Sequence, residues 1–386
     1  MLISLVLVAL NLRPALSSMA PVLAQVSDAL GLNASQAGLL TTLPVLCLGL
    51  FAPLAPWLAR RLGSEGTVFA ILLALMGGIL LRSNLGTFGL FVGSLLSGAS
   101  IGIIGVLLPG IVKRDFPAQA GMLTGVYTMA LCFGAALAAG STVPLTRYFD
   151  DSWRMGLGIW VIPALIAAVC WLPHLLRAHG TSSSQRKTGG LLRNRLAWQV
   201  TLFMGLQSSL AYIVFGWLPS ILIGRGLSPV QAGLVTSASI IVQMISSLAT
   251  PWLASRGRDQ RLAVVIVMTL VLCGMLGCLY APLGTLWGCA VVLGLGQGGS
   301  FSLGLALIVL RSPDAQVAGS LSSMAQGVGY TLASLGPLAV GILHDWSGSW
   351  DVLGWLFAAI GLAAMLFGLF AGRALQIEVA HEAGAK

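Results

Sequence analysis

The residue whose type and position point most directly to chemistry is Arg13, which lies inside an apolar run from Leu2 to about residue 23. A guanidinium keeps its charge, and near the centre of a bilayer it costs about 3 kcal/mol even on the gentler insertion scales. About 1.5 Å of helix rise per residue places Arg13 ~18 Å from Leu2, in a ~30 Å hydrocarbon slab. Such a cation favours a carboxylate, a cyanate-like ion or another electron-rich ligand. A structural arginine bonded to helix-end carbonyls is the alternative.

Two neighbours bear on what Arg13 can do. Asn11 could hold the guanidinium or bind a ligand. Pro14 removes a helix hydrogen bond and frees the carbonyl of Leu10, which weakens the helix beside the charge. This weakening could aid binding or bending, or it could reflect only the tolerance of membrane helices for proline.

Amide and phenol side chains in the other apolar runs are further candidates for a ligand site: Gln207, Tyr212, Tyr127, Gln297, Gln326 and Tyr330. Each could instead make an interhelical hydrogen bond, which is the commoner role of a polar residue in a membrane helix. The ring of Tyr212 could also stack on a planar ligand, although a packing role is an equal alternative.

Acidic and imidazole groups are placed very differently from Arg13. All eleven Asp and Glu residues and all four His residues fall in predicted loops or at the ends of apolar runs. Proton-coupled carriers usually relay the proton through such groups at membrane depth. We therefore expect a facilitator, an exchanger, or a carrier in which any proton rides on the substrate. The six cysteines lack a C-x-x-C pair or a nearby histidine, so we expect neither a metal nor a disulfide.

Two segments look like catalytic motifs. Residues 98–102 fit G-x-S-x-G and residues 294–299 fit G-x-G-x-x-G, but both lie within apolar helical runs without the strand that those motifs require. We interpret both as glycine faces that let helices approach closely. No nucleotide-binding P-loop is present, so we expect no cofactor and no enzymatic activity.

The composition indicates that these residues lie in lipid. Hydrophobic residues make up 57% of the 386, charged residues 8%, and there are 49 glycines, whereas a soluble domain is about 25% charged. The net charge of +9 comes from short segments between apolar runs rather than from a basic patch interleaved with aromatics. The sequence therefore predicts a polytopic membrane protein that does not bind nucleic acid.

Apolar runs long enough to span a membrane number twelve. They cover about 2–27, 36–59, 66–82, 86–112, 118–145, 155–176, 197–223, 230–254, 262–280, 283–310, 315–343 and 351–372. With a cytoplasmic N-terminus, fifteen of the twenty Lys and Arg residues fall on the cytoplasmic side and four opposite. The positive-inside rule then places both termini in the cytoplasm. We expect that the first run is not a signal peptide, because no Lys or Arg precedes it and it contains Arg13 and Pro14.

An internal repeat divides these spans into two sets of six. Residues 36–41 (QAGLLT) resemble residues 231–236 (QAGLVT), and the segment PWLA occurs at 56–59 and 251–254, at the same offset of 195 residues. We therefore expect an N-terminal half over residues 1–176, a flexible cytoplasmic linker over 177–196, and a C-terminal half over 197–386. Parallel repeats of this kind belong to transporters with a substrate site between the halves.

Several segments resemble the major facilitator superfamily, and within it the cyanate porter and 2-nitroimidazole transporter family. They are Asn11-Leu12-Arg13-Pro14, residues 108–117 (LPGIVKRDFP), 197–203 (AWQVTLF), 216–219 (GWLP) and 324–330 (MAQGVGY). The resemblance implies a twelve-helix, all-α fold in which spans one, four, seven and ten line a central cavity that contains Arg13. It also implies alternating access in a bacterial inner membrane.

One segment departs from the superfamily. The loop after the second span usually has an acidic residue, then a basic one, then a glycine, whereas this chain has Arg60, Arg61 and Gly63. An inter-half salt bridge from the missing carboxylate is therefore in doubt, and we expect gating to use other contacts.

We therefore expect a monomeric transporter of a small anionic or polar planar solute, with Arg13 as substrate anchor. The remaining alternatives are a membrane receptor or assembly factor on a transporter fold, and a channel. The absence of charged rings argues against the channel.

Overall fold

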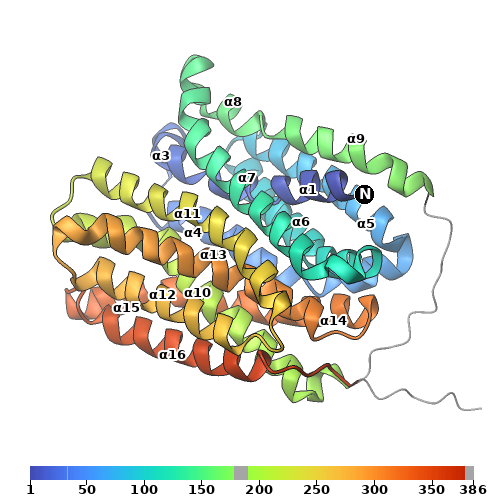
Figure 1. Ribbon diagram of the computed structural model, residues 1–386. Coiled ribbons are helices and arrows are strands. Elements are labelled where there is room, and N and C mark those ends of the chain that lie inside the picture. Colours follow the sequence, from blue (N-terminus) through green and yellow to red (C-terminus); the bar gives the residue numbers. More distant parts are fainter. Residues whose placement is uncertain (33, 178–189, 379–386) are drawn as a thin grey trace, which may run out of the picture.

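The computed structural model describes residues 1–32, 34–177 and 190–378, and these form a bundle of helices without strands (Figure 1). Among these residues, ten helices are long and apolar enough to cross a membrane, and Leu2–Ser17 and Thr42–Phe51 are shorter apolar helices. In lipid every backbone N–H and C=O must be bonded within the protein, and a helix does this within one segment. The expected all-α fold with twelve spans is confirmed.

The first six spans form the N-terminal half. Its helices are α1 (Leu2–Asn11), α2 (Pro14–Ser17), η1 (Ala20–Val22), α3 (Leu23–Leu30), α4 (Ala34–Phe51), α5 (Leu54–Asn84), α6 (Gly86–Asp115), η2 (Pro117–Gln119), α7 (Ala120–Tyr148), α8 (Trp153–Gly158) and α9 (Val161–Arg177). The first span is broken into α1 to α3. Helix α5 contains the end of the second span and all of the third, joined at a kink at Gly63.

The last six spans form the C-terminal half. Its helices are η3 (Leu191–Arg193), α10 (Arg195–Gly224), α11 (Pro229–Arg256), α12 (Arg261–Tyr280), η4 (Leu283–Thr285), α13 (Leu286–Leu310), α14 (Ala315–Ala333), α15 (Leu335–Ser347) and α16 (Leu353–Ala371). Most of the predicted linker, residues 178–189, lies outside the described residues, and the exact division of the chain there stays a prediction.

Equivalent helices of the two halves pack through equivalent glycines. A Cβ on Gly98 of α6 would collide with Pro44 of α4, and a Cβ on Gly294 of α13 would collide with the carbonyl of Ser239 in α11. Both glycines come from the segments that look like catalytic motifs, and the interpretation of these segments as helix-packing faces is confirmed. The fourth and tenth spans are thereby held at the centre of their halves.

The repeat also appears at the surface. Arg61 lies 4.3 Å from the ring centroid of Trp57, and Arg256 lies 3.7 Å from that of Trp252. These two pairs are separated by the same 195 residues as the PWLA segments. In both halves an arginine therefore covers the tryptophan of the PWLA segment, at the end of the second and of the eighth span.

The two halves lie side by side, with the N-terminus, the end of α9 and the end of α16 at one end of the bundle (Figure 1). We call this the linker end. Helices α4, α6 and α7 of the first half pack against α14, α13 and α11 of the second. The contacts include Gly110 against Ala315 and Gly125 against Leu248, both between the linker end and the middle of the bundle. The halves therefore touch closely on the linker side of the bundle centre.

Candidate functional site

Arg13 lies in a break of the first span. Helix α1 ends at Asn11 and α2 begins at Pro14, and the carbonyl of Arg13 accepts the first hydrogen bonds of α2. Pro14 has no N–H with which to continue the helical ladder. The expected weakening of the helix beside Arg13 is confirmed, because the helix is interrupted there.

The carbonyl of Leu10, which Pro14 leaves without its helical donor, lies against Gly134 of α7. A Cβ on residue 134 would collide with this oxygen, so glycine permits the backbones to come this close. The break in the first span therefore packs closely against the fifth span.

Arg13 is partly exposed, and the central carbon of its guanidinium lies 4.9 Å from the centroid of the Phe301 ring in α13. This cation–π contact joins the two halves, and such contacts contribute about 0.5–2 kcal/mol. Among the described residues, no carboxylate pairs with Arg13 and no helix-end carbonyl accepts a hydrogen bond from it. Its five N–H donors therefore remain available to a ligand.

A cavity surrounds Arg13 at the interface of the halves, and a water-sized sphere can place its centre over about 30 Å³ of it. Since about 10–15 Å³ on this measure holds one water molecule, the space admits a very small solute without rearrangement. Spans one, four, seven and ten contribute, as the resemblance implied, together with spans two, five and eleven. The lining residues are Leu12, Arg13, Leu16, Leu48, Ile101, Gly105, Leu108, Tyr127, Leu131, Tyr212, Phe301, Leu305, Gln326 and Tyr330.

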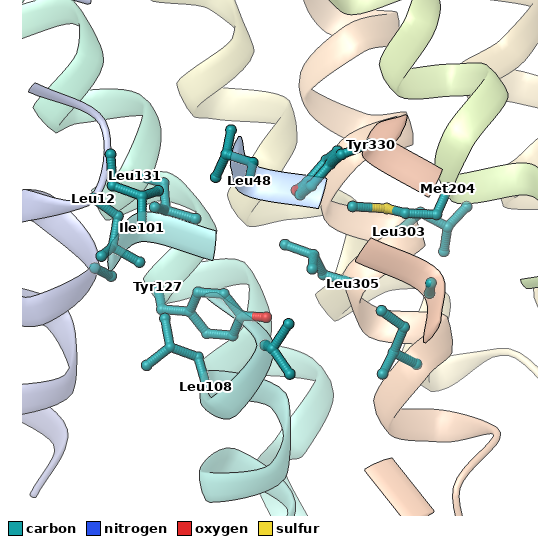
Figure 2. Packing of buried hydrophobic residues seen from close by; sticks show 14 of the residues in the cluster. Leu12, Leu48, Ile101, Leu108, Tyr127, Leu131, Met204, Leu303, Leu305 and Tyr330 are labelled. Carbon is teal, nitrogen blue, oxygen red and sulfur yellow. The ribbon is translucent and has the colours of Figure 1, made fainter. Parts of the chain in front are cut away.

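Three tyrosines supply most of the polar groups in this wall. Tyr127 of α7 is 1% exposed, and its hydroxyl has no hydrogen-bond partner. Tyr212 and Tyr330 meet edge to face with ring centroids 6.2 Å apart. Figure 2 shows Tyr127 and Tyr330 on opposite sides of an apolar space bordered by Leu48, Leu108 and Leu305. An unpaired buried hydroxyl is unfavourable in the empty protein, and a ligand acceptor would satisfy it.

Gln326 links the cavity wall to the opposite half. Its Nε2 atom donates to the carbonyl of Gly105 at 2.9 Å and to Ser322 Oγ at 2.8 Å. Gly105 belongs to α6 and Gln326 to α14, so this neutral hydrogen bond crosses between the halves. Gln326 thus combines a position beside Arg13 with an inter-half contact.

Three residues that we proposed as ligand contacts do not reach the cavity. Asn11 donates to the carbonyls of Leu7 at 2.8 Å and Pro163 at 3.1 Å, and so faces α9 instead of Arg13. Gln207 donates to Ser208 Oγ at 2.7 Å, and Gln297 accepts from Gln243 at 3.1 Å. All three make the interhelical or local hydrogen bonds that were the alternative reading of such residues.

Two contributors were not identified from the sequence. The contact of Phe301 with Arg13 is not apparent from the sequence, because a single aromatic residue in an apolar span usually indicates packing. Arg82 ends the third apolar run, on the side opposite the linker, where the sequence predicts no role for it beyond the charge asymmetry; in the structure it is 1% exposed and donates to the carbonyl of Ala15 and to Ser18 Oγ. The signal that could have found Arg82 is its position at the end of an apolar run, facing the broken first span.

Gly63 is the left-handed residue of the kink in α5, with φ 74° and ψ 164°, which glycine adopts without strain. Arg60 is exposed and Arg61 covers Trp57. The described ion pairs are Arg114 with Glu65, Arg114 with Asp115, and Arg261 with Asp259, and each lies within one half. The expectation that gating uses contacts other than salt bridges is consistent with these pairs and stays a prediction.

Comparison with known proteins places this arrangement in context. The family model of the Major Facilitator Superfamily matches residues 5–332 and 226–382. The chain is 38% identical over 377 residues to the 2-nitroimidazole transporter of Escherichia coli (strain K12), covering 97% of this chain and 95% of that protein. It is 32% identical over 372 residues to the cyanate transport protein CynX of the same organism, covering 95% of each.

Among solved structures, the chain resembles the proton:xylose symporter XylE bound to 6-bromo-6-deoxy-D-glucose. The TM-score is 0.83 at 14% sequence identity, over 98% of this chain and 97% of that chain. At this identity the likeness shows the shared fold and carries no information about the ligand.

Proposed function

This chain belongs to the Major Facilitator Superfamily, and from that membership we propose that it carries a small anionic or polarised planar solute across the membrane by alternating access. Arg13 is the anchor of the substrate, and Tyr127, Tyr212, Gln326 and Tyr330 complete the site. The two halves rock around this site so that it opens to one side at a time.

One observation carries the proposal: the guanidinium of Arg13 has no anionic partner among the described residues and faces a cavity shared by both halves. An unpaired cation in an apolar surrounding is unfavourable, whereas a charge-assisted hydrogen bond in the same place is strong. The cavity wall around it is apolar except for phenols and one amide. This chemistry selects a ligand with one electron-rich end and little other polarity.

The substrates named for two relatives fit this description. Cyanate is a compact linear anion, and a 2-nitroimidazole is a small conjugated ring with a nitro group. Both offer acceptors to the donors of Arg13, and the planar ring could also lie against Phe301 or the tyrosines. The relatives' names thus support cyanate-like or nitroimidazole-like compounds as the first ones to test.

The proposed cycle begins when the ligand meets Arg13 and the hydroxyl of Tyr127. Binding neutralises the cavity, satisfies donors from the first half, and brings the ligand against residues of the second half. A ligand that contacts both halves favours the closed arrangement over the open one. Reopening on the other side then releases it.

Flux measurements test this function. Purified protein in proteoliposomes at pH 8 should take up radiolabelled cyanate or 2-nitroimidazole with saturation and counterflow, above the rate of protein-free vesicles. Arg13→Gln should lose at least about tenfold in flux, since one charge-assisted bond is worth roughly 1.5–3 kcal/mol. Arg147→Gln is the matched control, because Arg147 is an exposed arginine at the end of α7.

A receptor or assembly factor on the same fold is the alternative. Such a protein would show ligand-dependent thermal stabilisation that Arg13→Gln abolishes, without saturable flux in the wild type. Equal stabilisation of the wild type and of Arg13→Gln by the ligand would instead mean that Arg13 has a structural role. The ligand would then be expected to bind the tyrosines and Gln326.

We also propose that both termini lie in the cytoplasm and that the carrier works as a monomer in a bacterial inner membrane. The orientation rests on the fifteen Lys and Arg residues that fall on the linker side. A protease site inserted after residue 183 should be cut in inverted vesicles and protected in intact cells; the reverse pattern would contradict this orientation.

A further inference from the structure

Arg13 gives the cavity between the two halves a positive charge. Of the residues that line it, Arg13 carries the only formal charge, and the others are apolar, phenolic or amide side chains. The contact with Phe301 stabilises the cation but does not neutralise it. The empty site therefore holds a net charge of one.

Among the residues that the structure describes, no acidic group pairs with Arg13 to cancel this charge in the absence of ligand. The acidic residues in the described part of the chain lie near helix ends, beside a kink or outside the helices, as at the kink of α5 (Glu65), the end of α6 (Asp115) and the start of α14 (Asp314). Among the described ones, Glu65, Asp115 and Asp259 are already paired with arginines. A carrier with an internal carboxylate could neutralise its own arginine, but no carboxylate lines the described cavity here, so this role falls to the ligand.

Alternating access passes through a state that is closed on both sides. The free energy of reaching this state differs between the empty and the loaded site. Enclosing an unpaired guanidinium between the halves removes its water without supplying a counter-ion, which is strongly unfavourable. Enclosing a guanidinium bonded to an anion leaves a neutral pair with satisfied donors. The loaded carrier therefore reorients readily, whereas the empty carrier reorients slowly.

We infer that this protein is an obligatory exchanger of small anions, in which each turnover moves one anion out and another in. This inference rests on the proposed function, and it adds the counter-substrate: a second compact monoanion, organic or inorganic, bound by Arg13 from the opposite side. The exchange is electroneutral, because the cavity crosses with the same charge in both directions.

The test measures efflux of radiolabelled cyanate from proteoliposomes at pH 8, with valinomycin and equal potassium clamping the membrane potential at zero. Efflux into medium containing unlabelled cyanate should be at least about tenfold faster than into medium whose anion is bulky gluconate. Formate and chloride, added separately, identify which small anions serve as counter-substrates. Protein-free vesicles correct for passive leak.

Variants distinguish the effect of the charge at residue 13 from an effect on folding. Arg147→Gln should keep the wild-type ratio of the two efflux rates, and Arg13→Lys should keep the dependence on an external anion, because the charge remains. Arg13→Gln should show a ratio near one, because its empty cavity is neutral. Size-exclusion profiles and melting temperatures establish that each variant is folded.

The outcomes distinguish this inference from the proposed function. Saturable wild-type flux at the same rate into cyanate and gluconate media overturns obligatory exchange and leaves transport standing. Concentrative uptake driven by a pH gradient into gluconate-loaded vesicles overturns it as well. Absence of protein-dependent flux and of cyanate-dependent thermal stabilisation overturns both.

Discussion

The guanidinium of Arg82, buried in the N-terminal half, donates to the carbonyl of Ala15 at 2.5 Å, two residues beyond the cation that faces the cavity. A second donor of Arg82 reaches Ser18 Oγ at 3.0 Å. Arg82 of the third span therefore fixes the position of α2 from within the N-terminal half, while Arg13 faces the C-terminal half. The buried Arg82 thus bonds to the backbone of the broken helix, whereas the partly exposed Arg13 has no acidic partner among the described residues.

Replacing Arg82 should damage the position of Arg13. Arg82→Ala leaves the Ala15 carbonyl without its donor, and an unsatisfied buried acceptor costs about 1–3 kcal/mol. We expect a lower melting temperature and weaker ligand-induced stabilisation. Ser18→Ala, which removes only one of the two contacts, is the control and should lose less. Wild-type stability in Arg82→Ala would show that α2 is held by packing alone.

The contact between Arg13 and Phe301 can be measured by a double-mutant cycle. Arg13→Gln, Phe301→Leu and the double variant should give a coupling of about 0.5–2 kcal/mol in unfolding free energy without ligand, because the cation faces the ring across the interface. Chemical denaturation in detergent supplies the four values. Additivity within about 0.3 kcal/mol would mean that the ring contributes packing only.

The hydroxyl of Tyr127 should matter only when ligand is bound. It has no partner in the empty protein, so Tyr127→Phe should leave the melting temperature unchanged or raise it, while weakening ligand-induced stabilisation. Tyr280→Phe is a matched control, because that hydroxyl donates to the carbonyl of Asp351. The control should lose about 0.5–1.5 kcal/mol of stability with no effect on ligand affinity; unchanged affinity in Tyr127→Phe would exclude contact with the ligand.

Closure on the linker side should depend on Gly125. A Cβ there would lie 2.8 Å from the carbonyl of Leu248 in the opposite half, whereas a Cβ on Gly140 of the same helix meets nothing within 4 Å. Gly125→Val should therefore wedge the halves apart and reduce flux at least about tenfold, and Gly140→Val should not. Maleimide labelling of Ser323→Cys, beside the same interface, should accelerate in Gly125→Val. Equal labelling in both glycine variants would contradict this role.

The class of fold and the position of the main charge were both predictable from the order of the residues. Twelve apolar runs, their repeat at 195 residues and Arg13 within the first run could be identified without a structure, because lipid requires each span to satisfy its own backbone and makes a buried cation conspicuous. A weakened helix beside Arg13 was predictable from the missing N–H of Pro14, and the structure shows that the helix is interrupted there.

Which polar side chains face the cavity depends instead on how the helices pack in the folded protein. Tyr127 and Gln326 reach it while Gln207 and Gln297 bond within the C-terminal half, although all four lie in apolar runs. Nearly every face of these spans is apolar, so hydropathy does not fix the rotation of a helix about its axis. Contacts such as Gly98 against Pro44 and Gly134 against Leu10 set that rotation, because backbones approach closely only where a side chain is absent.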